Sequence, residues 1–380
     1  MRSSGPEIVP FYAGEINRRA AALARAGRSI IPMHLGQPTR GPSDATVAAA
    51  NRALVVGPNG YWESHELKER LVEHYREWYG VEIESSRIVL TNGASAALVA
   101  VFASMFATGE RIAVARPGYP AYRNTLIGLG RVPVELDCGA ASRYRLTASV
   151  LAALDPAPHG VVVASPANPT GTMLDTGEFQ AIADECKRRE IVFISDEIYH
   201  GITYRGRSVS ALEVTQDVIV INSFSKFCRM PGWRLGWLVV PPVLVQKLQT
   251  YVNNFFLTPP NVAQAAAVAA LGDGNELRSA IIEYARNREV LLRELPKLGI
   301  LPVLEPEGAF YIYADVSRYT TSSLDWCHEL LEQTGIALAP GVDFDPIGGG
   351  PFVRLFTAVA MNEIEMALER LSKFLPGVSG

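Results

Sequence analysis

The feature that most constrains this fold is a regular alternation of short apolar runs with segments of helical periodicity. Seven runs rich in β-branched and other apolar residues occur between residues 87 and 240. Most of them are continuously apolar, which is typical of strands covered by helices on both faces. We therefore expect an α/β fold with a mostly parallel seven-stranded sheet, its strands at 87–90, 111–115, 132–136, 161–165, 191–195, 218–222 and 235–240.

The pattern changes after residue 259. Longer helical segments follow, at 262–271 and about 275–298, with only three further strand-like runs, at 309–314, 336–339 and 352–356. This mixture is typical of a smaller α+β domain, and a chain of 380 residues is long enough for two cores. We expect a large domain at 43–272 and a small domain at 273–380, which the N-terminal segment 1–42 joins.

Charge and cysteine content exclude several classes of function. The net charge of −4 gives no general attraction to nucleic acid or to an anionic membrane surface. The four cysteines are far apart and form no cluster with histidine, so neither a disulfide framework nor a metal site is indicated. The apolar runs are too short to span a bilayer. We expect a cytoplasmic protein that acts on small molecules, without nucleic-acid, membrane or metal partners.

One lysine follows the sixth expected strand in a setting suited to a phosphorylated ligand. Lys226 lies between Ser225 and an apolar residue, Ser223 precedes it, and Arg234 follows eight residues later. A lysine amine can form a Schiff base with an aldehyde, while hydroxyl groups and a guanidinium can hold a phosphate. The alternative is a surface turn with an ordinary solvated lysine.

The first strand ends in a glycine turn that leads into an alanine-rich helix. The backbone N–H groups of Gly93, Ala94 and Ser95 would form an anion site at the start of this helix. After the second strand, Tyr119 lies in a proline-braced loop, where its ring could stack on a planar ligand. A plain turn and a tyrosine packed on its neighbours remain the alternatives for these two segments.

Polar residues also follow the fourth and fifth strands. Asn168, which precedes a proline, is restricted in its backbone conformation and would present an amide. Asp196 ends a strongly apolar strand, so it needs a cationic partner such as a protonated pyridine nitrogen, and Tyr199 follows three residues later. The alternatives are a turn-forming asparagine and a structural ion pair. Because ligands of parallel sheets bind beyond the carboxyl ends of the strands, we expect all these residues to meet there.

In order along the chain, these motifs resemble those of the class I and II aminotransferases, a family of fold type I pyridoxal-phosphate enzymes. The resemblance covers nearly the whole chain. Its motifs are Leu35-Gly-Gln-Pro38, Thr91-Asn-Gly-Ala-Ser95, Pro117-Gly-Tyr-Pro120, Asn168-Pro-Thr-Gly171, Ser195-Asp-Glu-Ile-Tyr199, Ser223-Phe-Ser-Lys226, Gly232-Trp-Arg-Leu-Gly236, Gly308-Ala-Phe-Tyr311 and Phe352-Val-Arg354.

The resemblance implies a role for each residue in binding pyridoxal 5'-phosphate. Lys226 would carry the cofactor aldehyde and shuttle the proton, and Asp196 would pair with the pyridinium nitrogen. Tyr199 and Asn168 would contact the phenolic oxygen of the ring, on whose face Tyr119 would stack. The phosphate would be held by Gly93, Ala94, Ser95, Ser223, Ser225 and Arg234.

The resemblance also implies a substrate site and a partner subunit. Arg354 would grip the α-carboxylate of the amino acid, with Gly36 and Asn168 nearby. From the sequence alone Arg354 is an unusual charge within an apolar strand, which requires a partner. Tyr61 matches a tyrosine that reaches the phosphate of the other subunit, so a homodimer with shared active sites is implied.

The implied reaction is the transfer of an amino group from an amino acid to a 2-oxo acid by a ping-pong mechanism. The alternative is a β-lyase or another carbanion reaction with the same cofactor, because the first deprotonation is common to all of them. A regulatory or binding protein built on the same fold is disfavoured, since the lysine, the aspartate and both arginines are present. The substrate stays open: a second cation could be Arg25, Arg40 or Arg229, whereas an apolar pocket could be lined by Phe11, Tyr12, Trp62 and Phe256.

Overall fold

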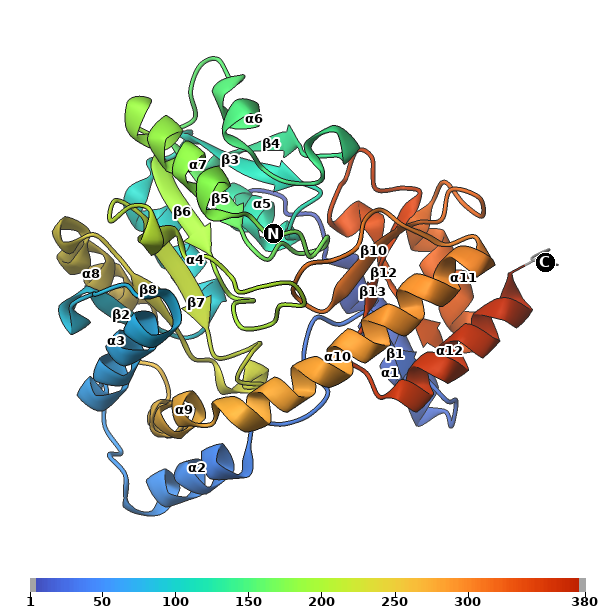
Figure 1. The fold of residues 1–380 in the computed structure, drawn as a ribbon, viewed down its shortest axis with the longest axis horizontal. Coiled ribbons are helices and arrows are strands. Elements are labelled where there is room, and N and C mark those ends of the chain that lie inside the picture. The colour runs from blue at the N-terminus through green and yellow to red at the C-terminus, as the bar shows by residue number, and fades with distance from the viewer. Residues whose placement is uncertain (1–4, 376–380) are drawn as a thin grey trace.

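The computed structural model describes residues 5–375 and has two parts, each built around its own sheet (Figure 1). The larger part contains the strands β2 to β8 and most of the helices between α2 and α9. The smaller part contains α1 (Tyr12–Arg25), most of α10 (Gly274–Glu294), α11 (Ser323–Thr334) and α12 (Met361–Phe374). α10 begins beside α9 and runs diagonally across the molecule toward the smaller part.

The larger sheet has seven strands in the order β2-β8-β7-β6-β5-β3-β4. All are parallel except β8, which is antiparallel to both of its neighbours. The predicted mostly parallel seven-stranded sheet is therefore confirmed. The strands are β2 (Ile88–Thr91), β3 (Arg111–Arg116), β4 (Val132–Asp137), β5 (Gly160–Ala164), β6 (Val192–Asp196), β7 (Ile219–Ser223) and β8 (Gly236–Val239).

Helices cover both faces of this sheet, which explains the continuous apolar runs. Every residue of β2, β7 and β8 is buried. One face packs against α3 (His65–Tyr79), α6 (Ala148–Ala152), α7 (Thr176–Arg188) and α9 (Asn261–Gly272). The other face packs against α4 (Ala94–Met105), α5 (Pro120–Gly128) and α8 (Val245–Phe256). α2 (Asp44–Val56) packs on α9 at the edge of the molecule (Figure 1).

The smaller part has a four-stranded antiparallel sheet in the order β12-β13-β10-β9 and a separate parallel pair, β1 and β11. α1, α10, α11 and α12 share one core with these strands. The strands are β1 (Ile31–Pro32), β9 (Leu301–Pro302), β10 (Tyr311–Asp315), β11 (Ile336–Ala337), β12 (Ala339–Pro340) and β13 (Phe352–Phe356). This part brings residues near both ends of the chain together.

One expected strand, at 336–339, is divided in the structure. Its first half, β11, pairs with β1, and its second half, β12, pairs with β13 in the other sheet. The chain passes from one sheet to the other at Leu338, which is fully buried. A continuous apolar run indicates that a strand is buried, but it does not indicate which strand it pairs with. The sequence could therefore not show this division.

None of the helices within residues 5–375 has both the length and the apolar character needed to cross a membrane.

Candidate active site

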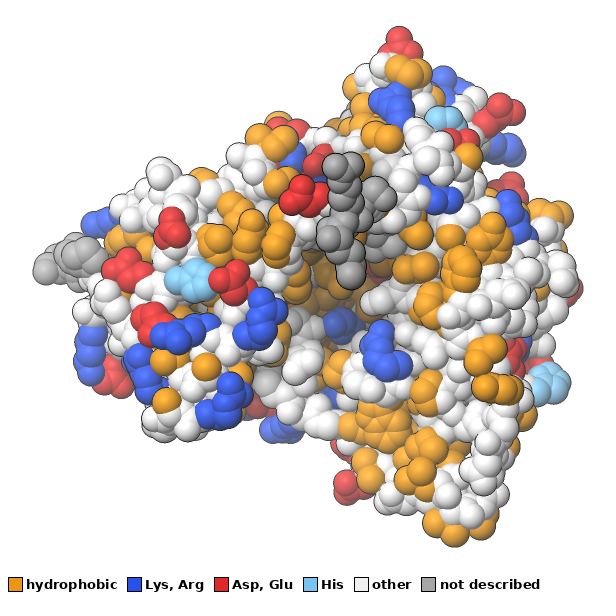
Figure 2. All heavy atoms as spheres, turned by 180° about the vertical axis from the view of Figure 1, so that it is seen from behind, with side chains coloured by type: hydrophobic (Ala, Val, Ile, Leu, Met, Phe, Trp, Pro, Cys, Tyr) orange, Lys and Arg blue, Asp and Glu red, His pale blue; other side chains and the backbone are white. Residues whose placement is uncertain are grey.

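The strand ends of the large sheet converge as expected. Because β2, β3, β5, β6 and β7 run in the same direction, Thr91, Arg116, Ala164, Asp196 and Ser223 end at one edge. A cavity of about 240 Å³ lies beyond this edge and also reaches β10 and β13 of the smaller part. The molecular face seen in Figure 2 is hollowed near its centre, between the two parts.

Lys226 projects into this cavity from the turn that follows β7. Its side-chain amine, Nζ, donates a hydrogen bond to the carbonyl oxygen of Gly36 at 2.5 Å and lies 5.8 Å from the centre of the Tyr199 ring. Burial, together with the positive charges of Arg354 and Arg234, lowers the pKa of this amine to about 8, although Asp196 opposes the shift. A larger fraction of this lysine is therefore neutral near pH 7 than in an ordinary lysine.

The lowered pKa predicts how the amine reacts with pH. We expect the rate of acetylation of Lys226 in cofactor-free protein to rise with pH and to level off above about pH 8, because only the neutral amine is nucleophilic. Competitive labelling with acetic anhydride, followed by peptide mass spectrometry, measures this rate. A plateau that begins only above about pH 10, as for an ordinary solvated lysine, would contradict the assigned shift.

Asp196, the last residue of β6, is 3% exposed and lies in the same cavity. Its carboxylate accepts hydrogen bonds from the hydroxyl of Tyr122 at 2.5 Å and from the backbone N–H of Ile198 at 3.1 Å. Burial raises the pKa of this carboxyl, whereas these hydrogen bonds and the positive charge of Lys226 favour the ionised form. Tyr122 was not singled out from the sequence. Its place three residues after Tyr119, at the start of α5, was the available signal.

Arg354, in the middle of β13 of the smaller part, is 2% exposed and also lines the cavity. Its guanidinium donates to the side-chain oxygen of Asn168 at 2.9 Å and to the backbone oxygen of His34 at 2.8 Å. The rings of Tyr311 and Phe344 lie 4.3 and 4.6 Å from it. Its Nε atom has no partner among the described residues, so the guanidinium keeps a donor for a further acceptor.

His34 lines the cavity beside Arg354 without adding a positive charge. Burial, reinforced by Arg354, lowers the pKa of the imidazole to about 4, so the ring is neutral at physiological pH. One ring nitrogen lies 3.1 Å from the amide oxygen of Asn17. The cavity therefore has three cationic side chains among its lining residues, Lys226, Arg234 and Arg354.

The hydroxyl groups of Tyr199 and Tyr311 form a pair in the cavity that Lys226 also lines. Their oxygen atoms lie 2.6 Å apart, and both side chains line the cavity. Glycine is required at position 36, since a Cβ atom there would lie 2.2 Å from the Tyr311 hydroxyl. The sequence placed Tyr311 in a motif but gave it no role, because nothing local indicates that β10 faces the end of β6.

The turn after β2 forms a recess for an anion. Gly93 has φ +80 and caps α4, and a Cβ atom at this position would lie 2.4 Å from the Arg234 guanidinium. Arg234 in turn donates to the backbone oxygen of Asn92 at 3.3 Å. Ala94, Ser95 and Arg234 line the cavity, so the start of α4 and the guanidinium face the same space.

The two serines before Lys226 differ in their access to the cavity. Ser225 is among the lining residues, whereas Ser223 is not. The Ser223 hydroxyl oxygen lies 2.8 Å from that of Ser225 and 3.0 Å from the backbone oxygen of Leu235. Ser225 therefore lies in the cavity wall, and the Ser223 hydroxyl donates a hydrogen bond to the Ser225 hydroxyl behind it.

The two remaining sequence candidates lie in different surroundings. Tyr119 lines the cavity and packs edge-on against Tyr122, with ring centres 5.4 Å apart. Tyr61 is 81% exposed and is not among the residues that line the cavity of its own chain.

These residues fit the cofactor that the sequence motifs imply. A buried amine suits its aldehyde, a buried carboxylate suits its ring nitrogen, and a recess that a Cβ atom at Gly93 would fill suits its phosphate. The fold, with a lysine, an aspartate and two arginines around the cavity beyond the strand ends, is that of the fold type I class of pyridoxal-phosphate enzymes. Among the described residues, no group of histidine, cysteine or acidic side chains could hold a metal ion.

Comparison with known proteins identifies the family. Residues 28–371 match the family model "Aminotransferase class I and II". A relative named valine–pyruvate aminotransferase, from Mycobacterium tuberculosis, is 41% identical over 97% of each chain. The chain therefore belongs to the class I and II aminotransferases, whose members are pyridoxal-phosphate enzymes, and it transfers amino groups between amino acids and 2-oxo acids.

Solved structures agree with this assignment. A crystal structure of an aminotransferase from Mycobacterium tuberculosis superposes with a TM-score of 0.94 at 41% identity, covering 97% of each chain. A putative aminotransferase from Silicibacter pomeroyi gives a TM-score of 0.91 at 41% identity, over 99% of each chain. The aspartate aminotransferase of Thermus thermophilus with maleate gives 0.90 at 28% identity, over 97% of each. The relatives thus share the fold but differ in their named substrates.

Proposed function

We propose that this chain binds pyridoxal 5'-phosphate in the cavity at the strand ends and uses it to transaminate amino acids with apolar side chains. Lys226 would hold the aldehyde, Asp196 the ring nitrogen, and Tyr119 the ring face. The phosphate would lie against the start of α4, Ser225 and Arg234. When bound, this cofactor withdraws electrons from the α-carbon of an amino acid attached to it.

Lys226 and Asp196 would act on protons within this site. With its lowered pKa, the Lys226 amine can accept a proton from the substrate α-carbon and return it to a neighbouring carbon on the same face. The ionised Asp196 carboxylate would hold a proton on the ring nitrogen, and its hydrogen bond from Tyr122 fixes its orientation. Tyr199, with its hydroxyl beside that of Tyr311, would donate a hydrogen bond to the phenolic oxygen.

Arg354 and Asn168 would orient both substrates. The Arg354 guanidinium lines the same cavity as Asp196 and can donate two parallel hydrogen bonds to an α-carboxylate. An amino acid and a 2-oxo acid carry the same carboxylate, so one site would serve each in turn. This sharing supports the ping-pong order, in which the first product leaves before the second substrate binds.

The observation that carries the substrate proposal is the set of charges around the cavity. The cavity has three cationic side chains, and each would already have a role. Lys226 would hold the aldehyde, Arg234 the phosphate and Arg354 the α-carboxylate. A side-chain carboxylate would find no fourth cation among the described lining residues, and burying an unpaired carboxylate is costly. Apolar side chains line the space instead, namely Phe11, Leu35, Leu98, Pro166 and Ile198.

The three arginines considered from the sequence lie elsewhere. Arg40 is 2.9 Å from Glu283, and Arg229 is 2.7 Å from Glu276. Arg25 is exposed at the end of α1, and none of the three lines the cavity. Of the four aromatic candidates for an apolar lining, only Phe11 is among the lining residues. A relative whose name includes valine and pyruvate supports the same preference.

A steady-state comparison of two donors tests this proposal. With pyruvate as acceptor, we expect kcat/KM for valine to exceed that for aspartate by at least about tenfold, because an unpaired carboxylate must be desolvated. Without the acceptor, release of 2-oxo acid should stop after about one equivalent per active site, and continued turnover should require the acceptor. A higher kcat/KM for aspartate would contradict the substrate proposal, and acceptor-independent release of 2-oxo acid and ammonia would indicate elimination instead of transfer.

We also propose a homodimer in which Tyr61 of each chain reaches the phosphate site of the other. The supporting observation is a run of exposed apolar side chains at the end of α2 and beyond, where Val55 and Val56 are each 82% exposed and Tyr61 is 81% exposed. Exposed apolar groups close together often mark an interface.

Analytical ultracentrifugation tests the dimer. We expect twice the chain mass of 41.3 kDa, and we expect Val56→Asp to shift the protein toward the monomer, because a charge would be buried at the contact. Val132→Asp, at an exposed apolar position of β4, the last strand at one edge of the large sheet, is the control. A monomeric wild-type protein would contradict the dimer.

We propose the domain boundaries that the sequence indicates, with residues 1–42 joining a small domain at 273–380 and a large domain between them. The separate cores support this division. α1 packs with α10, α11 and α12, whereas α3 and α9 pack on the large sheet.

A further inference from the structure

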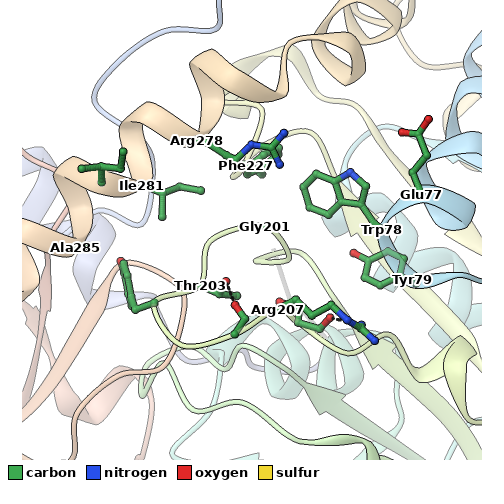
Figure 3. A pocket seen from close by; sticks show the side chains of 14 residues that line it. Glu77, Trp78, Tyr79, Gly201, Thr203, Arg207, Phe227, Arg278, Ile281 and Ala285 are labelled. Atoms are coloured by element: carbon green, nitrogen blue, oxygen red, sulfur yellow. Dashed lines mark hydrogen bonds between the residues drawn. The ribbon is translucent and has the colours of Figure 1, made fainter.

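A second cavity, of about 720 Å³, lies outside the site described above (Figure 3). It is formed by the end of α3, the loop 201–208 and the first half of α10. Phe227, which directly follows Lys226 in the chain, is the only residue of the Lys226 turn among its lining residues. Its volume is within the range of small-molecule sites, about 300–1,000 Å³.

Aromatic and branched apolar side chains form two facing walls of this cavity. Trp78 at the end of α3 packs edge-on against Phe227, with ring centres 5.2 Å apart. Ile281 and Ile282 of α10 and the ring of Tyr204 complete the apolar lining. In Figure 3 the side chains of Trp78, Phe227 and Ile281 border one open space, a shape suited to a flat ring.

A guanidinium without a partner lies at this space. Arg278 is an exposed residue of α10 that lines the cavity, and no hydrogen bond or ion pair joins it to the other side chains that the structure describes. The other lining arginine, Arg207, is already bound to both carboxylate oxygens of Glu213, at 2.7 and 2.6 Å. Glu77 at the same cavity adds a negative charge. The Arg278 guanidinium can pair with one carboxylate of a ligand, whereas the Glu77 carboxylate would repel a second negative charge near it.

We propose that this cavity is a second binding site, which takes a small aromatic carboxylate. The aromatic ring would lie against Trp78 and Phe227, and the carboxylate would pair with Arg278. Because the site includes Phe227, a bound ligand contacts the turn that carries Lys226 without entering the catalytic cavity. The proposal does not depend on which amino acid the enzyme transaminates.

Calorimetric titration of the holoenzyme with 2-naphthoate tests this site. Two variants remove its features: Arg278→Gln removes the free charge, and Ala285→Trp fills the cavity from α10. The matched control is Arg286→Gln, which removes a charge from the residue that follows Ala285 in α10 and is not among those that line the cavity. Arg354→Gln distinguishes binding in the catalytic cavity, where the carboxylate would also find a guanidinium.

We expect saturable binding by the wild-type protein, by Arg286→Gln and by Arg354→Gln, and a loss of affinity of about tenfold or more in Arg278→Gln and Ala285→Trp. Unchanged thermal unfolding and unchanged transamination in Arg278→Gln would show that the loss is local. Equal affinity in all variants, loss in Arg354→Gln alone, or no saturable binding at millimolar probe would overturn the proposal. None of these outcomes depends on turnover.

Discussion

Replacing Lys226 by alanine is expected to lower the rate of transamination by at least about 10⁴-fold. The variant loses both the amine that would hold the cofactor aldehyde and the base that would move the α-proton, and general acid–base catalysis alone accounts for about 10²- to 10⁴-fold. The steady-state rate with a saturating amino acid and 2-oxo acid measures this loss. The visible absorption that depends on the lysine should disappear as well.

The control for this variant is Lys247→Ala, which removes an exposed lysine from α8. We expect it to retain the wild-type rate, since Lys247 is not among the residues that line the catalytic cavity. Circular dichroism should show that both variants are folded. A Lys226→Ala protein with more than about one percent of the wild-type rate would rule out the assigned role, because no other lysine lines this cavity among the described residues.

Replacing Arg354 by glutamine is expected to lower kcat/KM for the amino acid by about 10³-fold. Two hydrogen bonds from a charged donor would be lost, each contributing about 1.5–3 kcal/mol, and both are made to substrate and transition state. A buried guanidinium that is 2% exposed also holds Asn168 in place through a bond of 2.9 Å. The loss should therefore appear for the donor and for the 2-oxo acid alike.

Two further variants separate charge from geometry at this position. Arg354→Lys keeps the charge but cannot form two parallel hydrogen bonds, so we expect kcat/KM to stay about 10²-fold below the wild type. Arg18→Gln, on an exposed face of α1, should leave both substrates unaffected. Cofactor binding, followed by visible absorption, should be preserved in Arg354→Gln. Equal loss of cofactor and substrate affinity would mean that Arg354 maintains the fold of the site instead of gripping the carboxylate.

Local sequence determined the large sheet and the residues at its edge. A strand covered on both faces must be apolar along its length, so the seven strands appear as continuous runs with clear ends. The residues after these runs, among them Ser95, Asp196 and Lys226, lie at one edge because parallel strands place their carboxyl ends together. Direction and order along the chain were enough to bring these three side chains to one cavity.

Contacts between residues far apart in the chain could not be predicted from the local sequence. Lys226 bonds to Gly36, 190 positions away, and Arg354 bonds to Asn168, 186 positions away. The hydrogen-bond partners of Tyr122 and Tyr311 could not be predicted from the sequence either. Which side chain faces which strand end depends on how the two parts of the molecule pack. The motif that contains Tyr311 supported the resemblance to the family, but it did not predict which side chain Tyr311 contacts.

The sequence by itself determined the sheet, the family motifs and the position proposed for the reactive lysine, because each depends on local periodicity or on the direction of neighbouring strands. Only the tertiary structure decided which cations line the catalytic cavity, and so placed Arg40 and Arg229 in ion pairs outside it. It also created the second cavity, whose walls come from α3, the loop 201–208 and α10. Side chains this distant in sequence share a space only after the chain has folded, since burial and charge pairing are settled by packing.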